Sequence, residues 1–239
     1  VSRLYKKEIE NGLIKVLDQK NQGVSCARNN GAKEASSEYV CFLDADDEWE
    51  SDFLSKMNEL VADCPKANLY CLAHKVSKNK LPLVKARHGL PDDYRGYVKD
   101  FFKSSTKGSV ANSSKICLKK SSFVSVGGFP EGVSAGEDLY LWIRLALSGA
   151  VACEMSYSAN VYIEDDNSRG ARNSSVPYPF VFFSKNKNIS KNPSLNRYLF
   201  VIFYKHFLSS LLSLKLKEAW LRFFYYIKIY ISLVSEMGL

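Results

Sequence analysis

The sequence predicts an α/β fold in which a mostly parallel sheet is flanked by helices, with an amphipathic helical appendage at the C-terminus. A short apolar run, residues 39–43 (YVCFL), stops abruptly at an acidic cluster. Apolar runs of this length, bounded by polar residues, are typical of buried strands in parallel sheets. An amphipathic helix is expected directly afterwards over residues 51–61, and strand and helix patterns go on alternating downstream.

Composition indicates a globular protein with anionic partners. The 239 residues are 46% hydrophobic and 24% charged, which excludes global disorder. The formal charge of +8 and the pI near 9.1 favour nucleotide phosphates, nucleic acid or an acidic membrane surface, without choosing among them. Six cysteines form no C-x-x-C pair, and several lie in apolar runs, so we expect reduced, buried thiols.

The N-terminal third supplies the first candidate anion site. A weak helix and a short strand over residues 13–17 come first, followed by a turn that leads into a helix over residues 25–36. Ser25 is the expected N-cap of this helix. Arg28 falls in its first turn, where free N–H groups and the helix dipole attract anions. The alternative is a surface arginine that pairs with an acid.

The acidic cluster follows the strand at residues 39–43. It reads D-A-D-D and contains Asp44, Asp46 and Asp47. Carboxylates this close together repel one another unless a cation lies among them, and hard oxygen ligands suit Mg²⁺ or Mn²⁺ with phosphate oxygens completing the shell. The alternative is a solvated acidic turn that precedes a helix N-terminus.

Alternating elements continue towards the middle of the chain. The patterns predict a strand over 69–73, a basic loop over 74–95, a helix over 96–103, a strand over 115–118 and a helical turn over 121–126. His74 and His88 lie in the basic loop, where solvent exposure is the expectation. Gly127 and Gly128 then permit positive φ angles and close approach of the backbone to a ligand.

A buried helix is expected over residues 136–148, and it begins with Glu137 and Asp138. Acids in a first turn can simply compensate the helix dipole. Short strands at 150–153 and 160–163 follow. The polar segment 164–172, which includes Asp165, Asp166 and Arg169, suits a loop over a site.

We divide the chain into a main domain over residues 1–175, a linker over 176–194 and a C-terminal helical region over 195–239. This last region is aromatic, aliphatic and basic, and contains no apolar run of the roughly 18 residues that span a bilayer. Amphipathic helices on an anionic membrane surface fit this pattern. The alternative is a set of helices packed on the main domain or on a second subunit.

Three blocks in order carry a family resemblance: NQGVSCARNNG, the strand ending in LDADDEW, and VGGFPEG followed by EDLYLWIR. Over residues 18–165 the chain resembles the family-two inverting glycosyltransferases with the GT-A fold, which transfer sugars in bacterial surface polysaccharides. The resemblance implies a nucleotide-sugar donor, a glycan or polyprenyl-linked acceptor, Mg²⁺ or Mn²⁺ as cofactor, and no nucleic acid partner.

Position by position, the resemblance implies roles for the donor side of the site. Asp46 binds the metal, Asp44 contacts the ribose or the metal shell, and Arg28 faces the diphosphate. Gly127 and Gly128 pass the backbone close to the donor or acceptor sugar.

For the acceptor side, the resemblance implies that Asp138 is the catalytic base. Glu137 and Trp142 are candidates for the acceptor pocket, with a core role for Trp142 as the alternative. One base and one metal suffice for an inverting transfer, so no separate acid is needed.

The family begins with strands that bind the nucleobase, and the chain is expected to lack them. It is also expected to act in the cytoplasm, peripherally at the inner face of the cell membrane. Two other functions stay open: a truncated or degenerate, non-catalytic, membrane-associated binding protein, and a metal-dependent phosphohydrolase or nucleotidyltransferase that uses the D-x-D alone.

Overall fold

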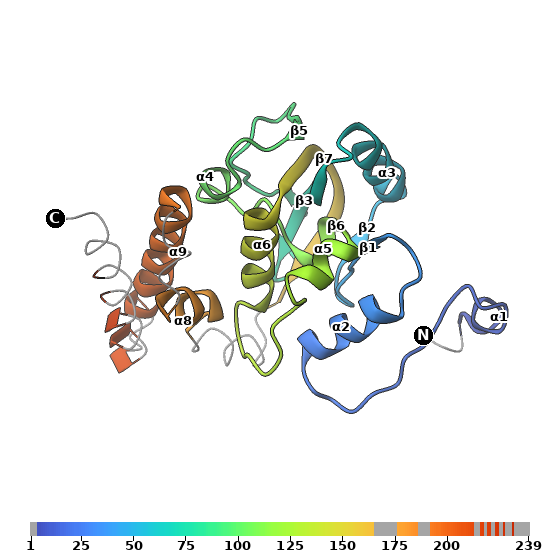
Figure 1. Ribbon diagram of the computed structural model, residues 1–239, viewed down its shortest axis with the longest axis horizontal. Helices are drawn as coiled ribbons and strands as arrows, with labels where there is room; N and C mark the ends of the chain where they lie inside the picture. Colours follow the sequence, from blue (N-terminus) through green and yellow to red (C-terminus); the bar gives the residue numbers. More distant parts are fainter. Residues whose placement is uncertain are drawn as a thin grey trace.

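A mixed sheet of seven strands forms the centre of the described structure, with helices on both faces (Figure 1). The computed structural model describes residues 4–164, 176–185 and 192–212, together with 216–217, 219–220, 223–224, 227 and 231. Asp165, Asp166 and Arg169, the candidates in the polar segment, lie outside the described residues.

Five strands form the main path of the sheet. Their order is β1 (Tyr39–Cys41), β6 (Ile116–Lys119), β3 (Ala67–Lys78), β7 (Ala150–Ile163) and β2 (Glu48–Trp49). Two short strands lie off this path: β4 (Val84–Lys85) pairs with β3, and β5 (Arg95–Tyr97) pairs with β7. The α/β class expected from the sequence is confirmed.

The strand directions differ from the mostly parallel sheet that the sequence predicts. Of the six pairings among the described residues, only β3 with β7 is parallel. β6 lies between β1 and β3 and runs against both, so β1, β3 and β7 still share one direction. A strand buried on both faces has the same apolar composition in either direction, which is why the residue pattern did not reveal the reversal.

Alternate residues of β3 point into two separate cores. Leu69 and Cys71 belong to the core beneath α6 (Glu137–Ser148), whereas Tyr70 and Leu72 belong to the core beneath α3 (Phe53–Asp63). This alternation is the period of two expected for a strand covered on both faces. All six cysteines are free and five of them are buried, as expected.

Several boundaries differ from the predictions because long-range pairing extends or removes elements. The two short strands expected at 150–153 and 160–163 are one strand, β7, whose pairing with β3 shifts register near Leu72 and Ala73. Residues 13–17 form no strand. The helix expected at 96–103 is divided between β5 and α4 (Phe101–Ser105).

Helix starts also differ in detail. α2 spans Val24–Glu34 with Gly23 as its N-cap residue, at φ 88°, and Ser25 is buried inside the first turn. α3 begins after Asp52. By contrast, α5 (Lys120–Ser125) lies within one residue of its prediction, and α6 ends at the predicted residue. α1 (Lys6–Glu10) buries no residue and projects from the body (Figure 1).

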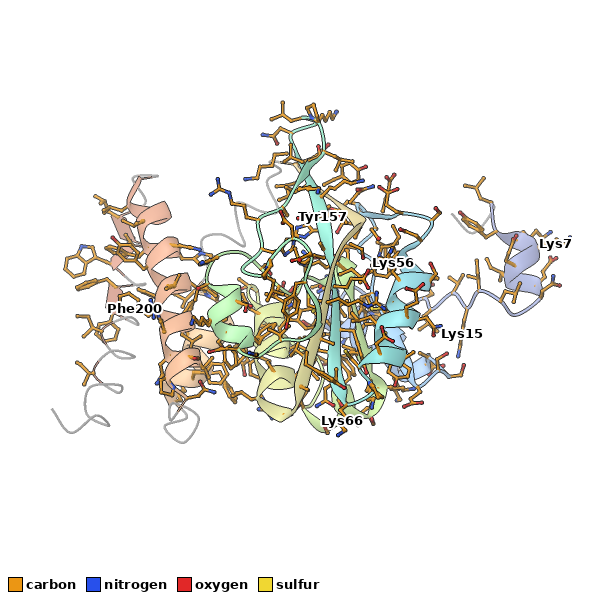
Figure 2. All side chains as sticks on the ribbon, turned by 90° about the horizontal axis from the view of Figure 1, so that it is seen from above. Lys7, Lys15, Lys56, Lys66, Tyr157 and Phe200 are labelled. Atoms are coloured by element: carbon orange, nitrogen blue, oxygen red, sulfur yellow. The ribbon has the colours of Figure 1, made fainter. Side chains whose placement is uncertain are left out.

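Two C-terminal helices pack against the main domain. α8 (Tyr178–Lys185) lies in the range predicted as a linker, and its Phe180 is buried against Phe203 at 5.3 Å between ring centroids. α9 (Pro193–Leu212) follows, and Figure 2 shows its Phe200 at the end of the molecule opposite Lys7 of α1. Of the helices that the structure describes, none combines the length and apolar character needed to cross a membrane.

The two faces of α9 should differ in their contribution to stability. Phe203 is 3% exposed and Phe200 is 38% exposed on the same helix. Phe203→Ala is expected to lower the free energy of unfolding by about 3–5 kcal/mol, because it opens a cavity in the core. Phe200→Ala is the matched control and should cost less than about 1 kcal/mol. Urea denaturation measures both; equal costs would show that α9 does not dock through this face.

Candidate functional site

The N-terminal half of α2, the segment after β1 and the first turn of α6 meet at one edge of the sheet. β1 ends at Cys41, and Asp44 follows three residues later at the carboxyl end of this strand. In open α/β sheets, ligands bind at this edge. The three blocks singled out in the sequence therefore lie together, although they are separated by up to 109 residues.

Arg28 is the centre of this cluster. Its Nη2 lies 2.5 Å from Oδ1 of Asp44, and its Nη1 lies 3.5 Å from Oε1 of Glu137. Only 12% of the Arg28 side chain is exposed, and its guanidinium lies 5.2 Å from the centroid of the Phe129 ring. Arg28 thus pairs with acids, as the alternative interpretation states. Because α2 begins at Val24, Arg28 is its fifth residue and lies just past the first turn, where the sequence had placed it.

The glycine loop is held against α2 by Asn29. Its Nδ2 donates to the backbone oxygen of Phe129 at 2.9 Å, and its Oδ1 accepts from the backbone N–H of Phe129 at 2.9 Å. Gly127 and Gly128 have φ angles of 90° and 68°, which glycine adopts without strain. The sequence placed Asn29 next to Arg28 but gave no signal of this contact, because its partner is 100 residues away.

Both carboxylate oxygens of Asp47 accept hydrogen bonds from the protein, and these bonds fix the turn that follows β1. Its Oδ2 accepts from Ser114 Oγ at 2.5 Å, and its Oδ1 accepts from the backbone N–H of Tyr162 at 3.0 Å. The same Ser114 hydroxyl accepts from the backbone N–H of Asp44 at 3.1 Å. Burial raises the pKa of Asp47 above its ordinary value. Ser114 therefore sets the positions of both acids, a role that the sequence did not suggest.

The surroundings of Asp138 raise the pKa of its carboxyl group. Burial, followed by the negative charge of Glu137, raises the pKa of Asp138 to about 6, while Arg28 opposes this shift. Its Oδ1 accepts from the backbone N–H of Leu139 at 2.6 Å. A carboxyl group whose pKa lies near neutrality can gain and lose a proton during a reaction.

The carboxylates of Asp44 and Asp46 suit a metal ion that also binds oxygen atoms of a ligand. Within the described residues, no group of three histidine, cysteine, aspartate or glutamate side chains is placed to hold a metal ion. Asp44 and Asp46 supply two carboxylates from one short turn. Mg²⁺ and similar cations are commonly held by one or two carboxylates together with substrate phosphates, so these two residues fit such a site.

The remaining predicted residues are placed as follows. The carboxylate of Glu137 faces Arg28 and forms an ion pair with it. Trp142 is 3% exposed and packs in the core, 6.0 Å from the Phe129 ring between centroids. Trp142 can meet an acceptor only if neighbouring side chains move, whereas the core role follows directly from its burial.

His74 and His88 are not solvated, contrary to the expectation for a basic loop. Their rings lie 5.4 Å apart near Lys115, whose side chain is fully buried and donates to the backbone oxygen of Ser109 at 2.9 Å. Burial lowers the pKa of His74 to about 2 and that of His88 to about 3, and the Lys115 charge adds to both shifts. β3 continues through His74, and this extension of the strand carries the ring inside.

Comparison with known proteins identifies the family. The model of glycosyl transferase family 2 matches residues 2–121, which is half of the chain. The chain belongs to glycosyl transferase family 2. The matched range includes Arg28, Asp44 and Asp46 and ends before Gly127. The assignment of the later residues to the family 2 site therefore rests on their convergence with Arg28.

Curated relatives of this family 2 chain match over short segments. The cholesterol galactosyltransferase of Borreliella burgdorferi is 39% identical over 74 residues, which are 28% of this chain and 21% of that protein. TuaG of Bacillus subtilis, named for teichuronic acid biosynthesis, is 30% identical over 82 residues, which are 34% of this chain and 32% of TuaG. The chain thus spans about a fifth to a third of these relatives.

Solved structures share the fold. TarS 1–349 of S. aureus, in complex with UDP-GlcNAc, has a TM-score of 0.60 at 15% identity and covers 85% of this chain and 61% of that one. GalNAc-T7 with UDP, GalNAc and Mn²⁺ has a TM-score of 0.51 at 16% identity and covers 84% of this chain and 39% of that one. The GT-A-like fold expected from the sequence is confirmed.

Removing the charge of Asp138 should stabilise the family 2 domain. The pKa of Asp138 is about 6 in the folded chain, against about 4 for an exposed aspartate. Between these values the folded state keeps a proton that the unfolded state has lost, so the free energy of unfolding falls as pH rises from about 4 to 6. Asp138→Asn should lack this fall and be more stable than wild type above pH 6, by about 1–3 kcal/mol.

Denaturant titrations at several pH values measure this difference. Asp52→Asn, which changes the exposed acid just before α3, is the matched control and should follow the wild-type pH dependence. A gap between wild type and Asp138→Asn that stays constant from pH 4 to 7 would contradict the raised pKa.

Proposed function

We propose that this chain transfers a sugar from a nucleotide-sugar donor to a hydroxyl of a glycan or lipid-linked acceptor, with inversion, in surface polysaccharide biosynthesis. The observation that carries the proposal is the convergence of Asp44, Arg28 and the Glu137–Asp138 pair at one edge of the sheet. Membership of family 2 supports the transfer reaction.

The donor diphosphate is proposed to bind between the first turn of α2 and the acidic strand end. The side chain of Arg28 and the free N–H groups at the start of α2 suit phosphate oxygens. The neighbours with UDP-GlcNAc and with UDP and Mn²⁺ support a nucleotide-sugar donor and a divalent metal. When bound to Asp46 and Asp44, Mg²⁺ or Mn²⁺ would stabilise the negative charge of the leaving diphosphate.

Asp138 is proposed as the catalytic base. Its carboxylate accepts the proton of the acceptor hydroxyl while that oxygen forms a bond to the sugar C1 from the side opposite the diphosphate. The bond between C1 and the diphosphate oxygen breaks in the same displacement, which inverts the configuration. A pKa of about 6 leaves Asp138 mostly ionised at pH 7 yet a stronger base than an exposed aspartate.

Other residues are proposed to shape the sugar-binding space. Gly127 is exposed beside α2, so its backbone can approach a donor or acceptor sugar without a side chain in the way. Gly128 sets the course of the same loop. Glu137 lies beside Asp138 at the start of α6, where we propose that it borders the acceptor. Trp142, one turn on, is proposed to border the acceptor only after neighbouring side chains move, because it is buried.

The acceptor is proposed to lie at the inner face of the cell membrane. An apolar pocket of about 270 Å³ lies between α9 and the residues after it, lined by Phe207, Leu211, Leu216, Ala219, Trp220 and Phe223. Large apolar side chains around it are exposed, among them Trp220 and Phe224, and Lys217 is exposed beside them. Aromatic and basic side chains together suit a membrane interface. The relatives named for cholesterol and for teichuronic acid support a lipid or glycan acceptor.

Transfer by the full-length protein should depend on the metal and the base. A screen of nucleotide sugars with Mg²⁺ and Mn²⁺, read by released nucleoside diphosphate, should reveal one preferred donor. Asp46→Ala and Asp138→Ala should each lower kcat by about 100-fold or more. Asp52→Ala, at the exposed residue before α3, is the control and should retain activity. Wild-type activity in both site variants would overturn the proposal.

Membrane contact should require both anionic lipid and the C-terminal aromatic residues. Flotation with phosphatidylglycerol vesicles is expected to carry the protein upward, and phosphatidylcholine vesicles should carry much less of it, because the basic side chains find no net charge there. Trp220→Asp combined with Phe224→Asp should abolish flotation. Leu54→Asp, at an exposed position of α3, should not. Wild-type protein that stays at the bottom with anionic vesicles would contradict membrane contact.

A further inference from the structure

Asn29 satisfies both backbone groups of Phe129 with one side chain. The two hydrogen bonds, each 2.9 Å, run in opposite directions between the amide and the backbone of a loop 100 residues away. Nδ2 of Asn29 also donates to Oε1 of Glu131 at 2.9 Å. The amide presents its donor and its acceptor on two separate atoms, which aspartate, serine and alanine do not, so none of these three can reproduce the full contact.

Gly128 allows this close approach. A Cβ atom at Gly128 would lie 2.8 Å from Oδ1 of Asn29 and 3.1 Å from the Phe123 ring, and the φ angle of 68° would strain any side chain. The glycine is therefore explained by the Asn29 contact as well as by any ligand. The loop and the helix are fitted to each other at this point.

Phe129 transmits the position of the loop to Arg28. Its ring is buried, with the ring centroids of Phe42 and Phe123 at 5.4 and 5.8 Å. The guanidinium of Arg28 lies 5.2 Å from the ring centroid, a cation–π distance. The ring thus forms a floor on which Arg28 reaches Asp44 and Glu137.

We infer that Asn29 is a positioning residue of the site: through Phe129 it fixes the Arg28 guanidinium between Asp44 and Glu137. A long arginine side chain has many rotamers, and packing against a fixed ring reduces the number of orientations open to it. The placement of Arg28 is a property of the chain itself. The effect of that placement on sugar transfer rests on the proposed function.

The first test needs no donor and so is independent of the proposed function. ¹⁵N relaxation of the Arg28 Nε–H group reports how rigidly the guanidinium is held. Asn29→Ala is expected to lower the order parameter of this group clearly. Asn30→Ala is the matched control, because Asn30 is the next residue and its Nδ2 donates to Gln19 Oε1 at 2.7 Å on the exposed side. An unchanged Arg28 order parameter in folded Asn29→Ala would overturn the inference.

Asn29→Ser serves if Asn29→Ala fails to fold, because serine keeps one of the two hydrogen bonds to Phe129. It should give an intermediate loss of Arg28 order. A fully ordered Arg28 in Asn29→Ser would contradict the inference in the same way.

The second test asks whether Asn29 acts through Arg28 during transfer. Asn29→Ala should lower kcat/KM for the donor about 10- to 100-fold, as small misplacements of binding groups do. In an Arg28→Ala background the same substitution should change kcat/KM by less than about twofold, because its target is gone. An equal loss in both backgrounds would show a merely structural role and overturn the inference. Absence of transfer by the wild type would count against the proposed function alone, and the relaxation result would still decide the role of Asn29.

Discussion

The charge balance around one buried arginine is the constraint on which the site depends. Arg28 is a cation close to three carboxylates, those of Asp44, Glu137 and Asp138. Removing one partner of a buried ion pair leaves an uncompensated charge, so these groups are energetically linked. Burial raises the pKa of Asp138, and the negative charges of Glu137 and Asp44 add to that rise. The same negative charges favour a second cation at the strand end. The divalent metal proposed to bind with the donor would supply this cation.

Hydrogen bonds from neighbouring segments hold this cluster in place. Ser114 joins the backbone of Asp44 to the carboxylate of Asp47, and Asp47 in turn binds the backbone of Tyr162 at the end of β7. Three distant segments are thus tied together beside Arg28. On the other side, Asn29 ties the glycine loop to α2. These hydrogen bonds involve backbone groups and the side chains of Ser114, Asp47 and Asn29, and they leave the Asp44 carboxylate and the Arg28 guanidinium unused.

The sequence predicted the parts of the site that are local in the chain. Arg28 at a helix start, Asp44 after a strand and the Glu137–Asp138 helix start each follow from a short pattern. Such short patterns do not reveal contacts between the segments, because the partner of Asn29 lies 100 residues away and that of Asp47 lies 67 residues away. The same limit explains the reversed β6, since burial patterns report exposure and not strand direction. His74 was misplaced because the strand that buries it continues past the apolar run.

The role of Asp44, Asp46 and Arg28 is tested most directly by locating Mn²⁺ in a crystal of the protein grown with a nucleoside diphosphate. Anomalous scattering identifies the metal without assumptions about the ligand. We expect one Mn²⁺ peak bound by the carboxylates of Asp46 and Asp44 and by diphosphate oxygens, with Arg28 beside the diphosphate. A diphosphate bound elsewhere, or a Mn²⁺ peak remote from Asp44 and Asp46, would contradict it.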